Sequence, residues 1–106
     1  MEPMLVISNV PDRDTAVAIA NALVGGRLAA CVNILAPCTS IYRWNGTVET
    51  AEEIPILVKT RSGLYAAVEA AIRERHPYEL PEIIAVRLDD GYSGYIEWIA
   101  GETSNL

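Results

Sequence analysis

The sequence predicts an α+β domain whose elements follow the order β-α-β-β-α-β, with a short helix at the end. Three observations lead to this class. Apolar runs of strand length alternate with stretches in which apolar residues recur at helical spacing. Asn45-Gly46 stands between two long strand-like stretches and indicates a hairpin, because a type I′ turn requires positive φ at both positions. Prolines and a glycine pair separate the elements.

The first strand is predicted at residues 4–7, a short apolar run that ends before Pro11. Asp12 or Asp14 is suited to cap the following helix, because a carboxylate there accepts hydrogen bonds from free backbone N–H groups. The Gly25-Gly26 pair predicts the end of this helix. Its apolar stripe comprises Ala16, Ile19, Ala20, Leu23 and Val24.

The second strand is predicted at residues 28–35, and Pro37 interrupts it because proline cannot donate a ladder hydrogen bond. A β-bulge at this point lets the strand resume at Ser40. Cys31 and Cys38 lie an odd number of positions apart, so a regular strand places them on opposite faces and no disulfide is expected between them. Unpaired cysteines indicate a reducing compartment, and we expect the protein to be cytoplasmic.

A two-residue turn at Asn45-Gly46 fixes the register of the hairpin. Tyr42 and Trp44 then lie on one face, where they form a candidate aromatic wall of a ligand cleft; cross-strand packing is the alternative. The returning strand is long, and Pro55 predicts a bulge or an edge within it. The expected pairs are Trp44 with Thr47, Arg43 with Val48, and Tyr42 with Glu49.

Ser62 is predicted to cap a second helix, which Pro77 closes. The fourth strand is placed at residues 83–88, and residues 92–100 fit a short terminal helix that Gly101 ends, with the last residues loosely held. This order is that of the ferredoxin-like split βαβ fold, in which two helices cover one face of an antiparallel sheet. The apolar stripe of the second helix comprises Leu64, Val68, Ala71 and Ile72.

The chain of 106 residues is expected to form one domain over residues 1–106, and 51% of it is hydrophobic. A surplus of apolar residues in so small a domain indicates a surface hidden by self-association. The hairpin strands, at about 12 residues, exceed the usual 5–6 and leave unpaired edges. Pairing with another copy of the chain is the obvious cover for such edges.

The net charge of −6, from 14 acidic and 8 basic residues, argues against nucleic acid as a partner, because a phosphate backbone requires a basic face. No apolar run approaches the ~18 residues that span a membrane, and the N-terminal residues lack the basic start of a signal peptide. An acidic surface is compatible with divalent cations as well as with simple solubility.

Residues 76–84 combine the only histidine with a phenol, two carboxylates and two prolines, and they lead directly into an apolar run. His76 is a candidate metal ligand with Glu79 and Glu82 as candidate partners, although a tight site needs three or four ordered ligands. The alternative is that His76 hydrogen-bonds a carbonyl at the end of the second helix.

No catalytic arrangement is legible, and we expect no enzymatic activity. Cys–His catalysis would need a cysteine beside His76, and packing in a strand is the simpler role for both cysteines. Gly25-Gly26 follows a helix instead of opening one, which excludes a phosphate-binding P-loop. Lys59 could meet an anionic ligand, and a solvated or ion-paired side chain is the alternative.

Four motifs in chain order are LAACVNI at 28–34, SIYRWNG at 40–46, LVKT at 57–60 and HPYELPEII at 76–84. Together with Pro11-Asp12 and YIEWI at 95–99, they closely resemble the CutA family of divalent-cation tolerance proteins over nearly the whole chain. The resemblance implies a homotrimer built through the long hairpin strands, and kinship with the PII signalling trimers, whose clefts between subunits hold small ligands.

The resemblance also implies tolerance of copper and other divalent metals, with copper(II) binding in some members and no required cofactor. The proposed copper ligands of the family include a cysteine in the first strand and a pair of adjacent histidines. Here Ser8 and Asn9 occupy the region of that cysteine and Arg75 precedes His76. Only His76 carries over, so weak binding of a divalent metal is expected.

Three functions follow as hypotheses. The first is a trimeric metal-responsive protein with a weak divalent site near His76. The second is a PII-like trimer that senses a small metabolite in an intersubunit cleft near His76, lined by Tyr42, Trp44, Lys59, Tyr78, Glu79 and Glu82. The third, an enzyme, is the weakest because it needs a converging base and nucleophile.

Overall fold

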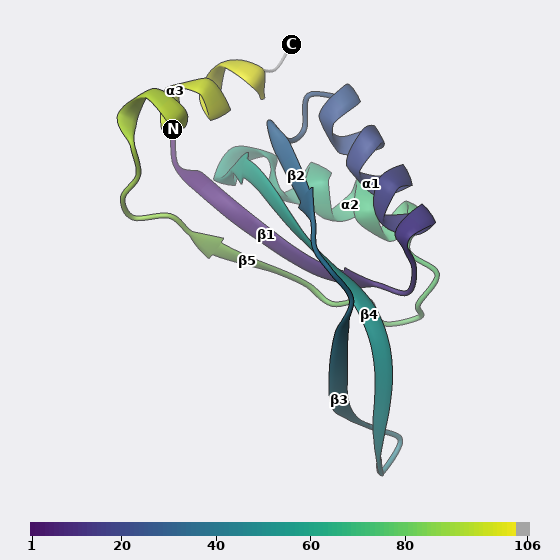
Figure 1. Cartoon of the computed structure of the whole chain (residues 1–106). Helices are drawn as coiled ribbons and strands as arrows, with labels where there is room; N and C mark the ends of the chain where they lie inside the picture. Colours follow the sequence, from purple (N-terminus) through teal and green to yellow (C-terminus); the bar gives the residue numbers. More distant parts are fainter. Residues whose placement is uncertain (104–106) are drawn as a thin grey trace.

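The computed structural model describes residues 1–103 and shows a sheet with a long projecting hairpin and three helices (Figure 1). The elements follow the expected order, except that the second strand is split in two and a 3-10 turn (Ser62–Leu64) precedes the second helix. Their bounds are β1 (Pro3–Val10), α1 (Arg13–Gly25), β2 (Cys31–Ile34), β3 (Cys38–Trp44), β4 (Thr47–Arg61), α2 (Tyr65–Arg75), β5 (Ile83–Arg87) and α3 (Ser93–Glu102).

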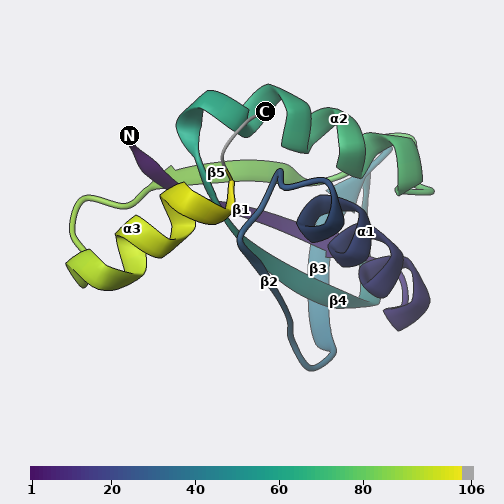
Figure 2. The same ribbon diagram turned by 90° about the horizontal axis from the view of Figure 1, so that it is seen from above.

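The sheet is antiparallel throughout, with β4 between β1 on one side and β2 and β3 on the other, and with β5 on the outer edge of β1. Every second residue of β1 is buried because α1 and α2 cover that face, lying side by side and apart from α3 (Figure 2). This confirms the α+β class and the ferredoxin-like order. The core includes Val6, Val10, Ile19, Leu23, Ile56, Val58, Val68 and Ile72.

The start of α1 confirms one of the two expected caps. Asp12 Oδ1 accepts a 2.8 Å hydrogen bond from the backbone N–H of Thr15, and the acidic Asp14 lies in the first turn. This hydrogen bonding at the helix N-terminus lowers the pKa of Asp12 below its ordinary value of 3.8.

The first helix ends at the predicted glycine pair, with Gly25 as its last residue and Gly26 as its C-cap. Gly26 has a φ of −86°, and the left-handed residue is Arg27, at 60°. The Leu28 N–H donates to the Leu23 carbonyl at 2.9 Å, which closes the helix as a Schellman-type cap. The guanidinium Nη2 of Arg27 also donates to the Gly101 carbonyl of α3 at 2.8 Å, which ties this turn to the terminal helix.

The second strand begins later than predicted, at Cys31 instead of residue 28, because Leu28 and Ala29 hydrogen-bond back to the end of α1. The bulge expected near Pro37 is present. Ladder pairing stops at residues 34 and 56 and resumes at residues 38 and 53, so residues 35–37 stand opposite residues 54–55. Three residues facing two make a β-bulge, and Pro55 lies within it as predicted.

Both cysteines are free, as expected, but the reason is different. The expectation that they lie on opposite faces is wrong: the bulge shifts the register by one residue, so Cys31 pairs with Lys59 and Cys38 with Glu53, which share one face of β4. The two thiols stay unpaired because six strand residues separate their partners by about 20 Å.

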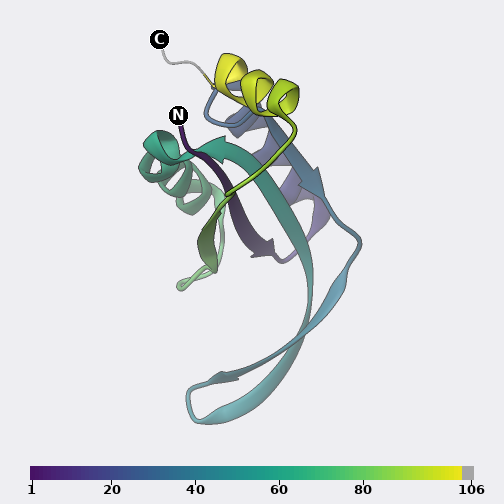
Figure 3. The same ribbon diagram turned by 90° about the vertical axis from the view of Figure 1, so that its left-hand side faces the viewer.

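The hairpin has the predicted turn and register. Asn45 and Gly46 have φ values of 48° and 83°, as a type I′ turn requires, and Tyr42 pairs with Glu49. The arm formed by β3 and the first half of β4 curves away from the body (Figure 3) and accounts for the 44 Å length of a molecule only 25 × 23 Å across.

Two helix boundaries differ from the predictions. The hydroxyl of Ser62 donates to Glu2 Oε1 at 3.3 Å instead of capping α2, which begins at Tyr65 after the 3-10 turn. Gly101 does not end the terminal helix, because α3 continues to Glu102. The expectation of a loosely held C-terminus concerns residues 104–106, which lie outside the described residues. No helix within residues 1–103 is long and apolar enough to cross a membrane.

Candidate functional site

A pocket of about 720 Å³ lies between the hairpin arm and the segment that follows α2. The arm supplies its residues from β3 and β4, and the segment supplies the opposite wall. The lining residues are Ser40, Ile41, Tyr42, Trp44, Glu53, Tyr78, Glu79, Leu80, Pro81 and Glu82. Five of the six predicted cleft residues therefore meet in one place within a single chain, the exception being Lys59.

The hairpin wall follows from strand alternation. Tyr42, Trp44 and Glu53 occupy alternate positions of the paired strands, so their side chains share one face of the arm. Tyr42 and Trp44 are 41% and 39% exposed, which leaves much of each ring open to the pocket and the solvent. Glu53, close to the body of the molecule, is only 9% exposed.

The opposite wall is anchored by His76, which is 7% exposed at the end of α2. Its Nδ1 accepts a 3.2 Å hydrogen bond from the backbone N–H of Tyr78, so the ring proton sits on Nε2 and donates to the Asn9 carbonyl at 2.7 Å. The expected hydrogen bond to the last turn of α2 is made by the His76 backbone N–H, which donates to Ile72 at 2.9 Å.

Asn9 hydrogen-bonds this segment at a second residue, Glu82. Its Nδ2 donates to Glu82 Oε1 at 3.1 Å, while its carbonyl accepts from His76. Asn9 lies near the end of β1, opposite Pro55 of the bulge. One residue of the sheet thus fixes both ends of residues 76–82 and positions the carboxylate of Glu82 at the pocket.

Tyr78 links the two walls. Its ring lies 4.7 Å from that of His76, centroid to centroid. Burial raises the pKa of Tyr78 above 10.0, and the charge of Glu53 and hydrogen bonding to it raise the pKa further, with smaller effects of Tyr42 and Asp12. The phenol is therefore neutral at physiological pH and lies near the Glu53 carboxylate.

Lys59 lies elsewhere, on the face of the sheet opposite α1 and α2. Its Nζ donates to the Asn33 side chain of β2, and it pairs across the ladder with Cys31. Tyr95 of α3 reaches the same cluster, where burial and then the Cys31 thiol raise its pKa. Lys59 does not line the pocket of the single chain, and its part in a cleft between subunits stays a prediction.

The arrangement offers carboxylate oxygens but no assembled metal centre. Within the described part of the chain, no three His, Cys, Asp or Glu side chains are grouped so that they could hold a metal ion. Both ring nitrogens of His76 are engaged by backbone groups, so a metal would have to displace one of these hydrogen bonds. Glu79 and Glu82 line the pocket, whereas His76 does not.

Two residues of the site, Asn9 and Glu53, were not predicted from the sequence. Asn9 acts across 67 and 73 positions of the chain, on His76 and Glu82, which local patterns do not show. Glu53 could have been placed on the Tyr42–Trp44 face by continuing the hairpin register along the strand.

A family model and individual known proteins both match this sequence, and they point to the same family. The family model described as "CutA1 divalent ion tolerance protein" matches residues 4–102. A Thermus thermophilus protein named divalent-cation tolerance protein CutA is 42% identical over 103 residues, which cover 97% of this chain and 99% of that protein. A chloroplastic protein CutA of Arabidopsis thaliana is 35% identical over 102 residues, 96% of this chain but 56% of the plant protein.

The structural similarity is equally extensive. The crystal structure of CutA from Xylella fastidiosa superposes with a TM-score of 0.95 at 40% sequence identity, covering 98% of this chain and all of that one. Sequence and fold agree over almost every described residue. The chain therefore belongs to the CutA1 family of divalent ion tolerance proteins.

Proposed function

We propose that the protein acts in divalent-cation tolerance as a homotrimer, as a binding protein and not as an enzyme. The match of the CutA1 model to residues 4–102 carries this proposal. We further propose that residues 1–106 act as one domain and that the protein is cytoplasmic, for which the two free thiols are the support.

Self-association is supported by the sheet face that α1 and α2 leave open. Ile84 and Val86 of β5 are 51% and 48% exposed there, next to Ile7 and Leu5 of β1. Apolar strand residues that point away from the core of a small domain require a cover, and a second copy supplies one. Sedimentation equilibrium is expected to give three times the chain mass of 11.5 kDa. A monomer mass would refute this part of the proposal.

For the metal, we propose weak copper(II) binding near His76 with oxygen ligands from Glu79 or Glu82. The support is the family and the acidic wall of the pocket, and the low affinity follows from the hydrogen bonds that already occupy His76. Calorimetric titration with copper(II) tests it on wild type, His76→Ala and the control Glu97→Gln. Equal heats for wild type and His76→Ala would remove His76 from the site.

A second function is favoured by the pocket itself, namely sensing of a small molecule by a PII-like trimer. A volume of about 720 Å³ lies in the range of small-molecule sites, and the lining joins aromatic and charged side chains. Binding of a ligand to the folded state raises the melting temperature. A thermal-shift screen of metabolites on wild type and Trp44→Leu tests this function, which fails if no compound shifts wild type more than the variant.

A further inference from the structure

The pocket carries negative charge that no basic side chain of its lining balances. Glu53, Glu79 and Glu82 line it, and no lysine or arginine among the described residues does. The ion pairs found within residues 1–103 involve other carboxylates, those of Glu2, Glu74 and Glu102. Within residues 1–103, no basic side chain therefore neutralises the charge of this site.

The unbalanced charge is most costly at Glu53, because a carboxylate that is 9% exposed has lost most of its hydration. The neutral phenol of Tyr78 lies near it but brings no positive charge. A buried carboxylate is stabilised by a cation placed against it, and the open side of the pocket is where such a cation could enter.

Three aromatic rings complete the site. Tyr42 and Trp44 stand on the hairpin wall, and Tyr78 stands on the other wall. The faces of such rings attract cations within about 6 Å, tryptophan most strongly. Carboxylates combined with aromatic faces favour an organic cation, which can use both kinds of contact at once.

We propose that this pocket binds a small organic cation of the ammonium class, an inference that rests on the second proposed function, small-molecule sensing. The ammonium group lies against Glu53, and its apolar substituents contact the rings of Trp44 and Tyr78. Phosphate-bearing ligands are disfavoured, since the lining offers them neither a basic side chain nor a helix N-terminus.

Three probes of nearly the same shape separate charge from size: phenethylammonium, phenethyl alcohol and phenylacetate. The full chain in its native oligomeric state is titrated with each and followed by calorimetry. We expect phenethylammonium to bind about tenfold or more tighter than the alcohol, and phenylacetate to bind least. Raising the salt concentration is expected to weaken the ammonium complex alone.

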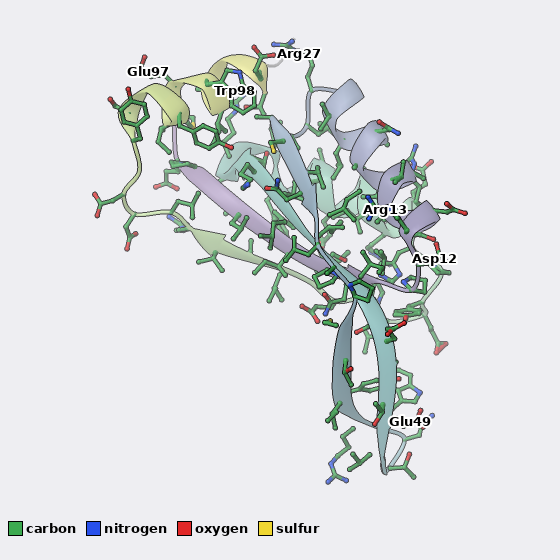
Figure 4. The ribbon with its side chains drawn as sticks, in the orientation of Figure 1. Asp12, Arg13, Arg27, Glu49, Glu97 and Trp98 are labelled. Carbon is green, nitrogen blue, oxygen red and sulfur yellow. The ribbon has the colours of Figure 1, made fainter. Side chains whose placement is uncertain are left out.

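Matched variants locate the binding. Glu79→Gln and Trp44→Leu are expected to weaken phenethylammonium binding several-fold, and Glu53→Gln to weaken it most. Glu97→Gln and Trp98→Leu are the controls, because both residues lie on α3, at the opposite end of the molecule from Glu49 and the hairpin (Figure 4). Trp98, 43% exposed, matches Trp44 in exposure. Since Glu53 is buried, Glu79→Gln keeps the test valid if Glu53→Gln fails to fold.

The outcomes are distinguishable. Equal binding of the three probes, lost in Trp44→Leu, would overturn the ammonium proposal and leave small-molecule sensing intact. Binding of no probe, by a protein that also shows no thermal shift in the metabolite screen, would overturn both. Tighter binding of phenethylammonium that is unchanged in Glu53→Gln and Glu79→Gln would place the cation elsewhere and contradict the proposal.

Discussion

The Nε2 of His76 donates to the carbonyl of Asn9 across 67 positions of the chain, at 2.7 Å. The tautomer is fixed by the other ring nitrogen, which accepts from the Tyr78 N–H. The histidine that the sequence offers as a candidate metal ligand therefore attaches residues 76–82 to β1. This attachment brings the acidic wall of the pocket against the hairpin.

His76→Ala is expected to lower the free energy of unfolding by about 2–3 kcal/mol, because it removes a buried ring and leaves two backbone groups without their partner. Urea unfolding at one fixed protein concentration measures the loss, since an oligomer changes stability with concentration. Arg75→Ala, at the preceding exposed position, is the control. A loss of less than about 0.5 kcal/mol would show that the histidine does not hold the segment.

Asp12→Ala is expected to destabilise the fold at neutral pH and to matter less in acid. The lowered pKa of Asp12 means that its folded-state stabilisation is present above the ordinary value of 3.8 and is lost as the pH falls through the folded-state value. The difference in stability between wild type and variant should therefore begin to shrink as the pH falls below about 4 and should vanish below the folded-state pKa of Asp12. Asp14→Ala, two residues further along and without the capping bond, is the control, and a difference that persists into acid would contradict the capping role.

Ser8 and Thr60 are expected to respond oppositely to loss of the hydroxyl, although both are fully buried. Thr60 Oγ1 donates to the Leu28 carbonyl at 2.7 Å, so Thr60→Val should cost about 1–2 kcal/mol. Ser8 Oγ has no partner among the described residues, so Ser8→Ala should leave stability unchanged or raise it by up to about 1 kcal/mol. Thermal unfolding compares the two, and a clear loss in Ser8→Ala would reveal a partner for that hydroxyl.

Much of the fold could be predicted from local chemistry. Asn45-Gly46 sets the hairpin register because the turn type depends on two residues alone, and the bulge followed from two prolines. The glycine pair also placed the end of α1, but the left-handed position falls on Arg27, whose side chain contacts Gly101, 74 positions away, and no local pattern shows this. The site divides in the same way: strand alternation placed Tyr42 and Trp44, whereas no local pattern shows that Asn9 holds the opposite wall.

The last prediction concerns the assembly. Ile84 is 51% exposed on the open face of the sheet, beside Ile7, and an apolar interface should cover both. Burying an isoleucine contributes about 1.5–3 kcal/mol, and a glutamate there also carries an unpaired charge into the interface. Ile84→Glu is therefore expected to raise the dissociation constant of the oligomer more than tenfold in sedimentation velocity. Val17→Glu, at a partly exposed position on α1, should sediment as wild type does. If Ile84→Glu keeps the wild-type mass at every dilution, the subunits meet through another surface, and the unpaired edges of the hairpin arm become the next to test.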